Sequence, residues 1–197
     1  MIFVPASIPV NSFREFVNYA KANQGKINYG SPGSGTTPHI SAESINKSFG
    51  LGMTHIPYKG ASQAVAALLA GDIQFYLAGA GLGAPHVKSG KLRAIAVSSK
   101  SRLDVFPDIP TFNEAGLGAI NASNWWGVAV PAGTPRAIGE KIRNALCKVM
   151  SEPSSKAAMT QMGNVPVCNS TMDAQKQFAE EALSWQRNLP GLNIKVD

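Results

Sequence analysis

Short apolar runs alternate with stretches of helical periodicity over the first hundred residues. A capping box, Ser12 with Glu15, opens one amphipathic stretch. A second apolar stripe, in 62–70, ends at Gly71, and helices are also predicted for 37–49 and 81–89. We expect strands at the runs between these helices, namely 1–5, 27–30, 53–56, 73–77 and 92–98. The alternation predicts an α/β fold with a mostly parallel sheet covered by helices on both faces.

The pattern changes after residues 106–124, "FPDIPTFNEAGLGAINASN", a Pro-, Gly- and Asn-rich segment that marks a candidate boundary. A strand is predicted beyond it at 125–130, and a short strand at 165–168. Helices are predicted at 135–150, 154–162 and 172–187. The first of these three helices carries one apolar stripe, formed by Ile138, Ile142, Leu146 and Val149.

Composition and charge limit the kinds of function that this protein can have. The chain has 197 residues, 44% of them hydrophobic, and a formal charge of +6. Its basic residues are dispersed, which argues against a nucleic-acid-binding arm and suits the attraction of small acids, or solubility alone. No apolar run approaches the roughly 20 residues that span a bilayer. Met1 leads into "IFVPASIPV" with no basic n-region, so the protein is expected to be cytosolic or to begin within a longer precursor.

The two cysteines, Cys147 and Cys168, leave two alternatives open. They form no CxxC motif, and no histidine stands in metal-ligand register with them. They are therefore either two buried free thiols or a disulfide, which requires an oxidising compartment. No metal site is expected.

The stretch "GSPGSGTTPH", residues 30–39, lies between a predicted strand and a predicted helix. It has the glycine spacing of a nucleotide phosphate loop, but Thr36 stands where that motif needs lysine. It is not a hydrolase nucleophile elbow, because neither Ser31 nor Ser34 has glycine two residues before and after it. A non-covalent anion site at the helix start is the third alternative, and a simple strand-to-helix turn is the fourth.

For the anion site we expect the main-chain amides of Gly33–Thr36 to converge on a carboxylate oxygen at the start of the helix. If these N–H groups point outward, or are already occupied by the protein's own carbonyls, the receptor interpretation is excluded.

Four ordered motifs identify a family resemblance: "KINYGSPGSGTTPHISAE", "MTHIPYKGASQAVAALLAGDIQF", "GAPHVKSGKLRAIAVSSKSR" with "FPDIPTFNEAG", and "WWGVAVPAGTP". Together they resemble the extracytoplasmic solute receptors of tripartite tricarboxylate transporters, the Bug (Bordetella uptake gene) family. The resemblance implies a periplasmic, two-lobed Venus-flytrap binding protein without enzymatic activity or cofactor. Family members clamp small carboxylates such as dicarboxylates and acidic amino acids, and this chain would deliver its ligand to the membrane subunits of the transporter.

The resemblance also implies which residues bind the ligand. They lie in three strand-to-helix loops: Ser31, Gly33, Ser34, Gly35, Thr36 and, one helical turn further, His39 in the first; Tyr58 and Lys59 in the second; Ala78 and Gly79 in the third. Ala78 stands where many members carry an aspartate, so a ligand amino group would lose its partner. We therefore expect a plain carboxylic acid rather than an amino acid. His39 could equally cap or pack, and Lys59 could be merely solvated.

The resemblance divides the chain into residues 1–8, a crossing strand between lobes; 9–123, one complete ligand-binding lobe; and 124–197, a return crossing strand with the C-terminal helices of an incomplete lobe. Exposed apolar stripes on those helices predict association with a second copy or with a separately supplied N-terminal half. Two alternatives stay open: a truncated paralogue without a transport role that acts as an interaction protein, and, less favoured, an enzyme that uses the glycine-rich loop as an oxyanion or phosphate site. Neither nucleic-acid binding nor membrane insertion is expected.

Overall fold

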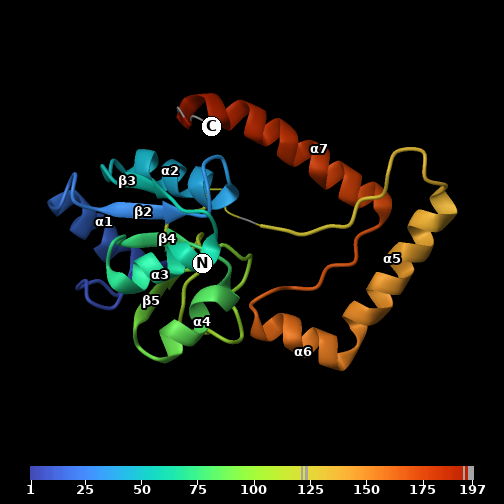
Figure 1. The fold of residues 1–197 in the computed structure, drawn as a ribbon, viewed down its shortest axis with the longest axis horizontal. Helices are drawn as coiled ribbons and strands as arrows, with labels where there is room; N and C mark the ends of the chain where they lie inside the picture. The colour runs from blue at the N-terminus through green and yellow to red at the C-terminus, as the bar shows by residue number, and fades with distance from the viewer. Residues whose placement is uncertain (121, 123, 193, 195–197) are drawn as a thin grey trace. The chain divides into compact units, whose positions relative to one another are not determined.

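The computed structural model describes residues 1–120, 122, 124–192 and 194, apart from the side chain of Asn188 (Figure 1). The described chain divides into two compact units. The first unit consists of Met1–Asn124 together with Leu189–Asp197, and the second of Trp125–Asn188. The last residues thus group with the first unit, whereas the sequence assigned them to the C-terminal helices. The assignment of the two units to two lobes stays a prediction.

The first unit is built on a five-stranded sheet with the order β3-β2-β4-β1-β5. Its strands are β1 (Ile2–Pro5), β2 (Asn28–Ser31), β3 (Thr54–Pro57), β4 (Phe75–Leu77) and β5 (Leu92–Ala96). Strand β2 pairs in parallel with both β3 and β4, and β1 pairs antiparallel with β4 and β5. Four strands therefore run in one direction and only β1 opposes them, which confirms the predicted mostly parallel sheet.

Helices cover both faces of this sheet, as the alternation predicted. They are α1 (Phe13–Ala22), α2 (Thr37–Phe49), α3 (Ala61–Ala70) and α4 (Ala80–Lys88). Residues of α1 and α2 pack in one core with Ile2 and Val4, and residues of α3 and α4 pack in the other with Phe3. Neighbouring residues of β1 thus enter opposite cores, as the period of two requires.

Local chemistry explains two of the helix ends. The N–H of Glu15 donates to Ser12 Oγ (3.2 Å), and Glu15 Oε2 accepts from the N–H of Asn11 (2.8 Å). This reciprocal arrangement satisfies two N–H groups at the start of α1. Helix α3 ends at Gly71, whose φ of 84° is a left-handed conformation that glycine adopts without strain.

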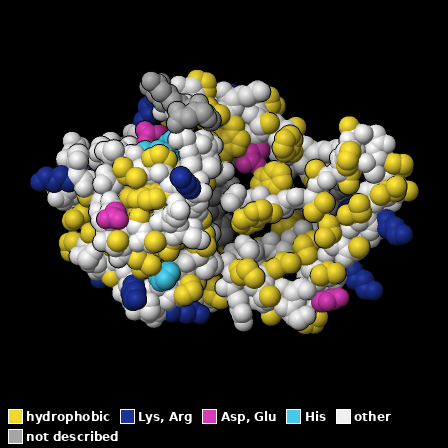
Figure 2. Space-filling model, viewed as in Figure 1, with side chains coloured by type: hydrophobic (Ala, Val, Ile, Leu, Met, Phe, Trp, Pro, Cys, Tyr) yellow, Lys and Arg dark blue, Asp and Glu magenta, His cyan; other side chains and the backbone are white. Residues whose placement is uncertain are grey.

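The second unit contains α5 (Arg136–Ser151), α6 (Pro153–Gln161) and α7 (Thr171–Asn188), within two residues of the predicted bounds. The predicted strands at 125–130 and 165–168 are wrong: neither segment forms a strand. An apolar run becomes a strand only if a neighbouring strand pairs with it, and no described residue does so here. The apolar stripe of α5 is exposed, with Val149 52% and Ile138 49% accessible, and Figure 2 shows many hydrophobic side chains on the surface of this unit.

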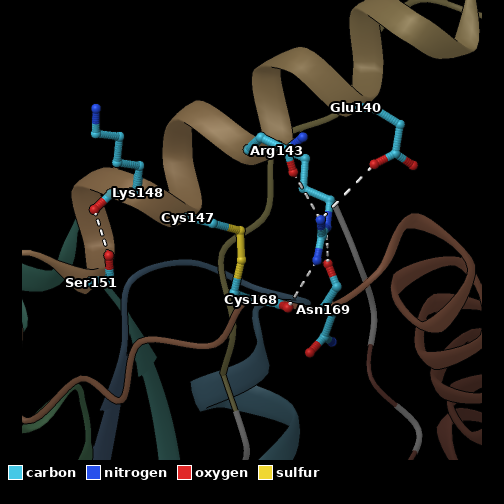
Figure 3. The surroundings of a disulfide bond; sticks show 8 residues. Glu140, Arg143, Cys147, Lys148, Ser151, Cys168 and Asn169 are labelled. Atoms are coloured by element: carbon cyan, nitrogen blue, oxygen red, sulfur yellow. Dashed lines mark hydrogen bonds and ion pairs between the residues drawn. A yellow bond between two sulfur atoms is a disulfide. The ribbon is translucent and has the colours of Figure 1, made fainter.

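A disulfide joins Cys147 of α5 to Cys168, with 5.7 Å between the two Cα atoms (Figure 3). The alternative of two free thiols is therefore wrong. The same segment is also held by Arg143, whose Nε donates to the carbonyl of Asn169 (2.7 Å). These contacts fix the segment between α6 and α7 to α5.

Candidate functional site

Three loops that carry the predicted site residues lie at one edge of the sheet. Strands β2, β3 and β4 are neighbours and run parallel, so their carboxyl ends lie at the same edge. Open α/β sheets bind ligands at such an edge. The loop after β2 holds the predicted residues Ser31–Thr36, the loop after β3 holds Tyr58 and Lys59, and the loop after β4 holds Ala78 and Gly79. The N–H of Tyr58 donates to the carbonyl of Ser31 (2.9 Å), which ties the first two loops together.

Within the first loop, most of the amides expected to bind ligand already have acceptors. The N–H of Gly33 donates to Ser31 Oγ (3.2 Å), and that of Gly35 donates to His39 Nδ1 (3.1 Å). The N–H of Thr36 makes a long bond to the carbonyl of Gly33 (3.4 Å). The expectation that the amides of Gly33–Thr36 converge on a ligand is therefore wrong for three of the four. The loop's own serine and histidine side chains close the turn instead.

The free donors are one N–H within this loop and two N–H groups in the first turn of α2. Within the described residues, the N–H groups of Ser34, Thr37 and His39 have no acceptor. Thr36 is the N-cap of α2, and its side chain does not cap the helix. The first intrahelical bond runs from the N–H of Ile40 to the carbonyl of Thr36 (3.0 Å). The start of α2 therefore keeps unpaired N–H groups and the positive end of the helix dipole.

The other two loops contribute less. The side chain of Lys59 is exposed, and its N–H donates to Gln63 Oε1 (3.2 Å). The N–H of Ala78 donates to the carbonyl of Met1 (3.0 Å), and Gly79 is the N-cap of α4. No aspartate or glutamate occurs in 31–37, 57–60 or 78–80. Lys59 is the only charged residue of these three loop segments.

Beneath the first loop lies a pair of stacked imidazole rings. The rings of His39 and His55 are 3.6 Å apart between centroids and 10° from parallel. His55 lies on β3 opposite Tyr29 of β2, and His39 lies on α2. His55 Nε2 is 2.7 Å from Ser31 Oγ, and the hydroxyl of Tyr29 donates to Glu43 (2.6 Å), which is four residues after His39 on α2.

Burial sets the protonation of these groups. Burial, together with the neighbouring His39, lowers the pKa of His55 to about 4. Burial also lowers the pKa of His39, although Glu43 opposes this effect. Burial and the nearby Glu43 raise the pKa of Tyr29. Both imidazoles are consequently neutral at pH 7, and Tyr29 keeps its proton.

A cavity of about 480 Å³ adjoins the stacked rings. It is lined by Tyr29, Ser34, His39, Glu43, Lys47, His55, Leu192 and Ile194. Only Ser34 and His39 belong to the residues predicted from the sequence. The other polar lining residues, Tyr29, Glu43, Lys47 and His55, were missed. The spacing of four between His39, Glu43 and Lys47 is the one pattern that could have indicated a common helix face.

Comparison with known proteins identifies the family. The family described as "Tripartite tricarboxylate transporter family receptor" matches residues 1–193. The chain belongs to this family. The chain is similar to the UPF0065 protein in gbd 5'region of Cupriavidus necator, with 37% identity over 188 residues, 94% of this chain and 56% of that protein. It is also similar to Protein BugT of Bordetella pertussis, with 27% identity over 178 residues, 90% of this chain and 55% of that protein. The predicted resemblance to the Bug family is thus confirmed.

Solved structures agree with this assignment. The chain matches a structure described as a periplasmic transporter with a TM-score of 0.92 and 32% identity over 100% of this chain and 65% of that one. It matches an R. palustris protein solved with adipate with a TM-score of 0.91 and 25% identity over 100% of this chain and 66% of that one. The periplasmic-binding-protein fold is therefore confirmed, and the family is one of receptors rather than enzymes. The chain spans about half the length of the curated relatives it matches.

The described residues add two findings of absence. They contain no helix long and apolar enough to cross a membrane. They also contain no group of three or more His, Cys, Asp or Glu residues arranged to hold a metal ion.

Proposed function

We propose that this chain is part of an extracytoplasmic receptor that binds a small carboxylate and delivers it to a tripartite tricarboxylate-type transporter. The observation that carries the proposal is the group of unpaired donors at the start of α2, at the edge where the loops after β2, β3 and β4 meet. The N–H groups of Ser34, Thr37 and His39 suit a carboxylate oxygen, which needs no arginine at such a helix start. Membership of the receptor family supports the same class of ligand.

The charge of the loops favours a plain organic acid over an amino acid. An ammonium group on the ligand needs a carboxylate partner when it leaves water, and 31–37, 57–60 and 78–80 offer none. Lys59 adds a positive charge to this edge. A di- or tricarboxylate is therefore the proposed ligand, and the R. palustris relative solved with adipate supports this chemical class.

The disulfide supports a periplasmic location. Disulfides persist in oxidising compartments such as the bacterial periplasm and are rare in the cytosol, and Cys147 is joined to Cys168. In that compartment the receptor would meet the membrane subunits of its transporter transiently.

A thermal-shift screen of matched acids tests the proposal. The pairs are succinate with aspartate and glutarate with glutamate, with adipate and citrate added. Ligand that binds only the folded state stabilises it by about 2.7 kcal/mol at 100 times Kd, which raises the Tm of a chain of this size by about 5–10 °C. We expect at least one plain acid to raise the Tm and its amino counterpart to do so less. A Tm that none of these acids moves would contradict carboxylate binding by this chain.

A second candidate function, an interaction protein without a transport role, is favoured by one observation. The apolar side chains of Ile138, Ile142, Leu146 and Val149 are exposed along α5. Such a stripe suits a protein partner or a second copy. Indifference to every acid in the screen, combined with a stable complex, would favour this candidate over the receptor.

A further inference from the structure

Both rings of the His39–His55 stack contact the glycine-rich loop. His39 Nδ1 accepts from the N–H of Gly35 (3.1 Å). His55 Nε2 lies 2.7 Å from Ser31 Oγ, and this hydroxyl both accepts from the N–H of Gly33 (3.2 Å) and donates to the carbonyl of Gly33 (2.9 Å). The stack therefore holds the loop at two points, on either side of Ser34, whose N–H is one of the unpaired donors.

The contact with Gly35 depends on the protonation state of His39. A ring nitrogen accepts a hydrogen bond only when it carries no proton. Because Nδ1 accepts here, the neutral ring carries its proton on Nε2, and adding a second proton at Nδ1 would break the bond to Gly35. The repulsion between two imidazolium rings at a centroid distance of 3.6 Å acts on His55, because a charged His39 disfavours a second charge on its neighbour.

The surrounding charges do not remove the dependence of the His39–Gly35 hydrogen bond on protonation. Glu43 of α2 favours a positive His39, but its Oε2 already accepts from the hydroxyl of Tyr29 on β2 and from Asn46. Lys47 of α2 lines the same cavity and adds positive charge there. The pKa of His39 stays below its usual range, because burial outweighs Glu43.

We propose that His39 and His55 are positioning residues, and that their stack holds Gly33–Gly35 in the conformation that presents the free amides only while His39 is neutral; His55 Nε2 donates to Ser31 Oγ and keeps this contact in either protonation state. The claim that the free amides bind a carboxylate rests on the proposed function. The claim that the two rings position the loop does not. Above pH 6.5 both rings are neutral and the loop is fully held. Because folding lowers the pKa of His39, its ring takes up the second proton only below pH 6.5, and there the bond to Gly35 breaks and the loop is released.

Amide exchange and NMR titration of the full chain test the positioning directly. At pH 7.5 the Gly35 N–H is expected to be protected. His39→Phe keeps an aromatic ring but loses the acceptor, so exchange at Gly35 should be about five- to tenfold faster, as the loss of one hydrogen bond implies. His39→Asn places Oδ1 in the position of Nδ1, so it should restore protection and remove its pH dependence. His86→Gln, which removes an imidazole remote from the loop, should leave the wild-type profile unchanged.

The wild-type protein provides a readout that needs no substitution. The Gly35 amide resonance should move together with the His39 ring resonances as the pH is lowered from 8 to 4. The positioning proposal is overturned if His39 titrates while the Gly35 resonance stays constant, or if His39→Phe leaves Gly35 protection unchanged. A coupled titration with no binding of succinate, adipate or citrate at any pH would uphold the positioning and overturn the proposed function instead.

Discussion

At the scale of single residues, the side chains next to a glycine-rich loop decide which of its amides can bind a ligand. Ser31 and His39 occupy the N–H groups of Gly33 and Gly35. Among the residues that the structure describes, the N–H groups of Ser34, Thr37 and His39 are instead the ones without an acceptor. Thr37 is the first residue of α2, where an N–H has no intrahelical partner.

This position allows one amide to be removed with little change to the fold. Thr37→Pro deletes the N–H at a helical position that proline favours, and Thr36, with φ −73° and ψ 156°, already has the conformation that precedes proline. If this N–H binds the carboxylate, affinity should fall by about 10- to 100-fold, the range for a hydrogen bond to a charged group. Calorimetric titration of both proteins with the acid that raises the Tm most would measure this loss of affinity.

Thr37→Ala is the matched control, because it removes the hydroxyl and keeps the N–H. It should bind much more tightly than Thr37→Pro, and both variants should melt close to the wild type without ligand. Equal affinities in the two variants would show that the Thr37 amide does not contact the ligand.

The same residues show how much of this site the sequence could predict. Motif order and strand-to-helix alternation were sufficient to place Ser31, Tyr58 and Ala78 in three loops at one sheet edge. The glycine spacing could not show that His39 turns back to accept from Gly35, because a side-chain direction depends on the packing around it. The stacking of His55 on His39 was missed for a similar reason: it needs the parallel register of β2 with β3, which joins residues 26 positions apart.

At the scale of elements, the close packing between α4 and β1 depends on a glycine, which has no side chain. A Cβ built at Gly83 of α4 would lie 2.3 Å from the ring of Phe3, which is 1% accessible. By contrast, nothing lies within 4 Å of the same atom at Gly139 of α5. The two helical glycines therefore serve as a matched pair.

Gly83→Ala should destabilise the first unit by about 1–3 kcal/mol, the usual effect of overpacking a core, which exceeds the gain in helix propensity. Gly139→Ala should stabilise the second unit by about 0.5–1 kcal/mol through helix propensity alone. Denaturation can follow each unit separately, because the four tyrosines lie within Met1–Asn124 and the three tryptophans within Trp125–Asn188. A neutral Gly83→Ala would mean that the Phe3 ring moves aside freely.

The elements also show where periodicity fails as evidence. Residues 125–130 and 165–168 contain apolar runs that resemble the buried strands β4 and β5, yet neither forms a strand. A strand is defined by its hydrogen-bonded neighbour, which a local pattern cannot supply. Helices close their own hydrogen bonds, and α5, α6 and α7 were accordingly predicted to within two residues.

At the scale of the whole molecule, the second unit leaves more apolar surface exposed than a stable monomer usually does. Its large exposed hydrophobic side chains include Ile138, Ile142, Leu146, Val149, Met172 and Phe178. Sedimentation velocity at micromolar concentration should therefore show species heavier than the 20.7 kDa chain.

A double substitution, Ile142→Asp with Leu146→Asp, should shift that distribution toward the monomer, because charge on the stripe opposes its burial. Lys141→Asp, a charge change at an exposed position of the same helix, is the control and should have little effect. A wild-type chain that sediments as a compact monomer would refute association through this stripe.

The central position of strand β1 in the sheet affects how the chain folds. It lies between β4 and β5, so its hydrogen-bonding partners are 73 and more positions later in the sequence, as the pairing of Phe3 with Tyr76 illustrates. Loop closure over such separations slows folding, and an unpaired apolar strand invites aggregation. During synthesis the segment "IFVP" therefore stays without its β5 partner until residue 96 has been added, and it is open to aggregation for that time.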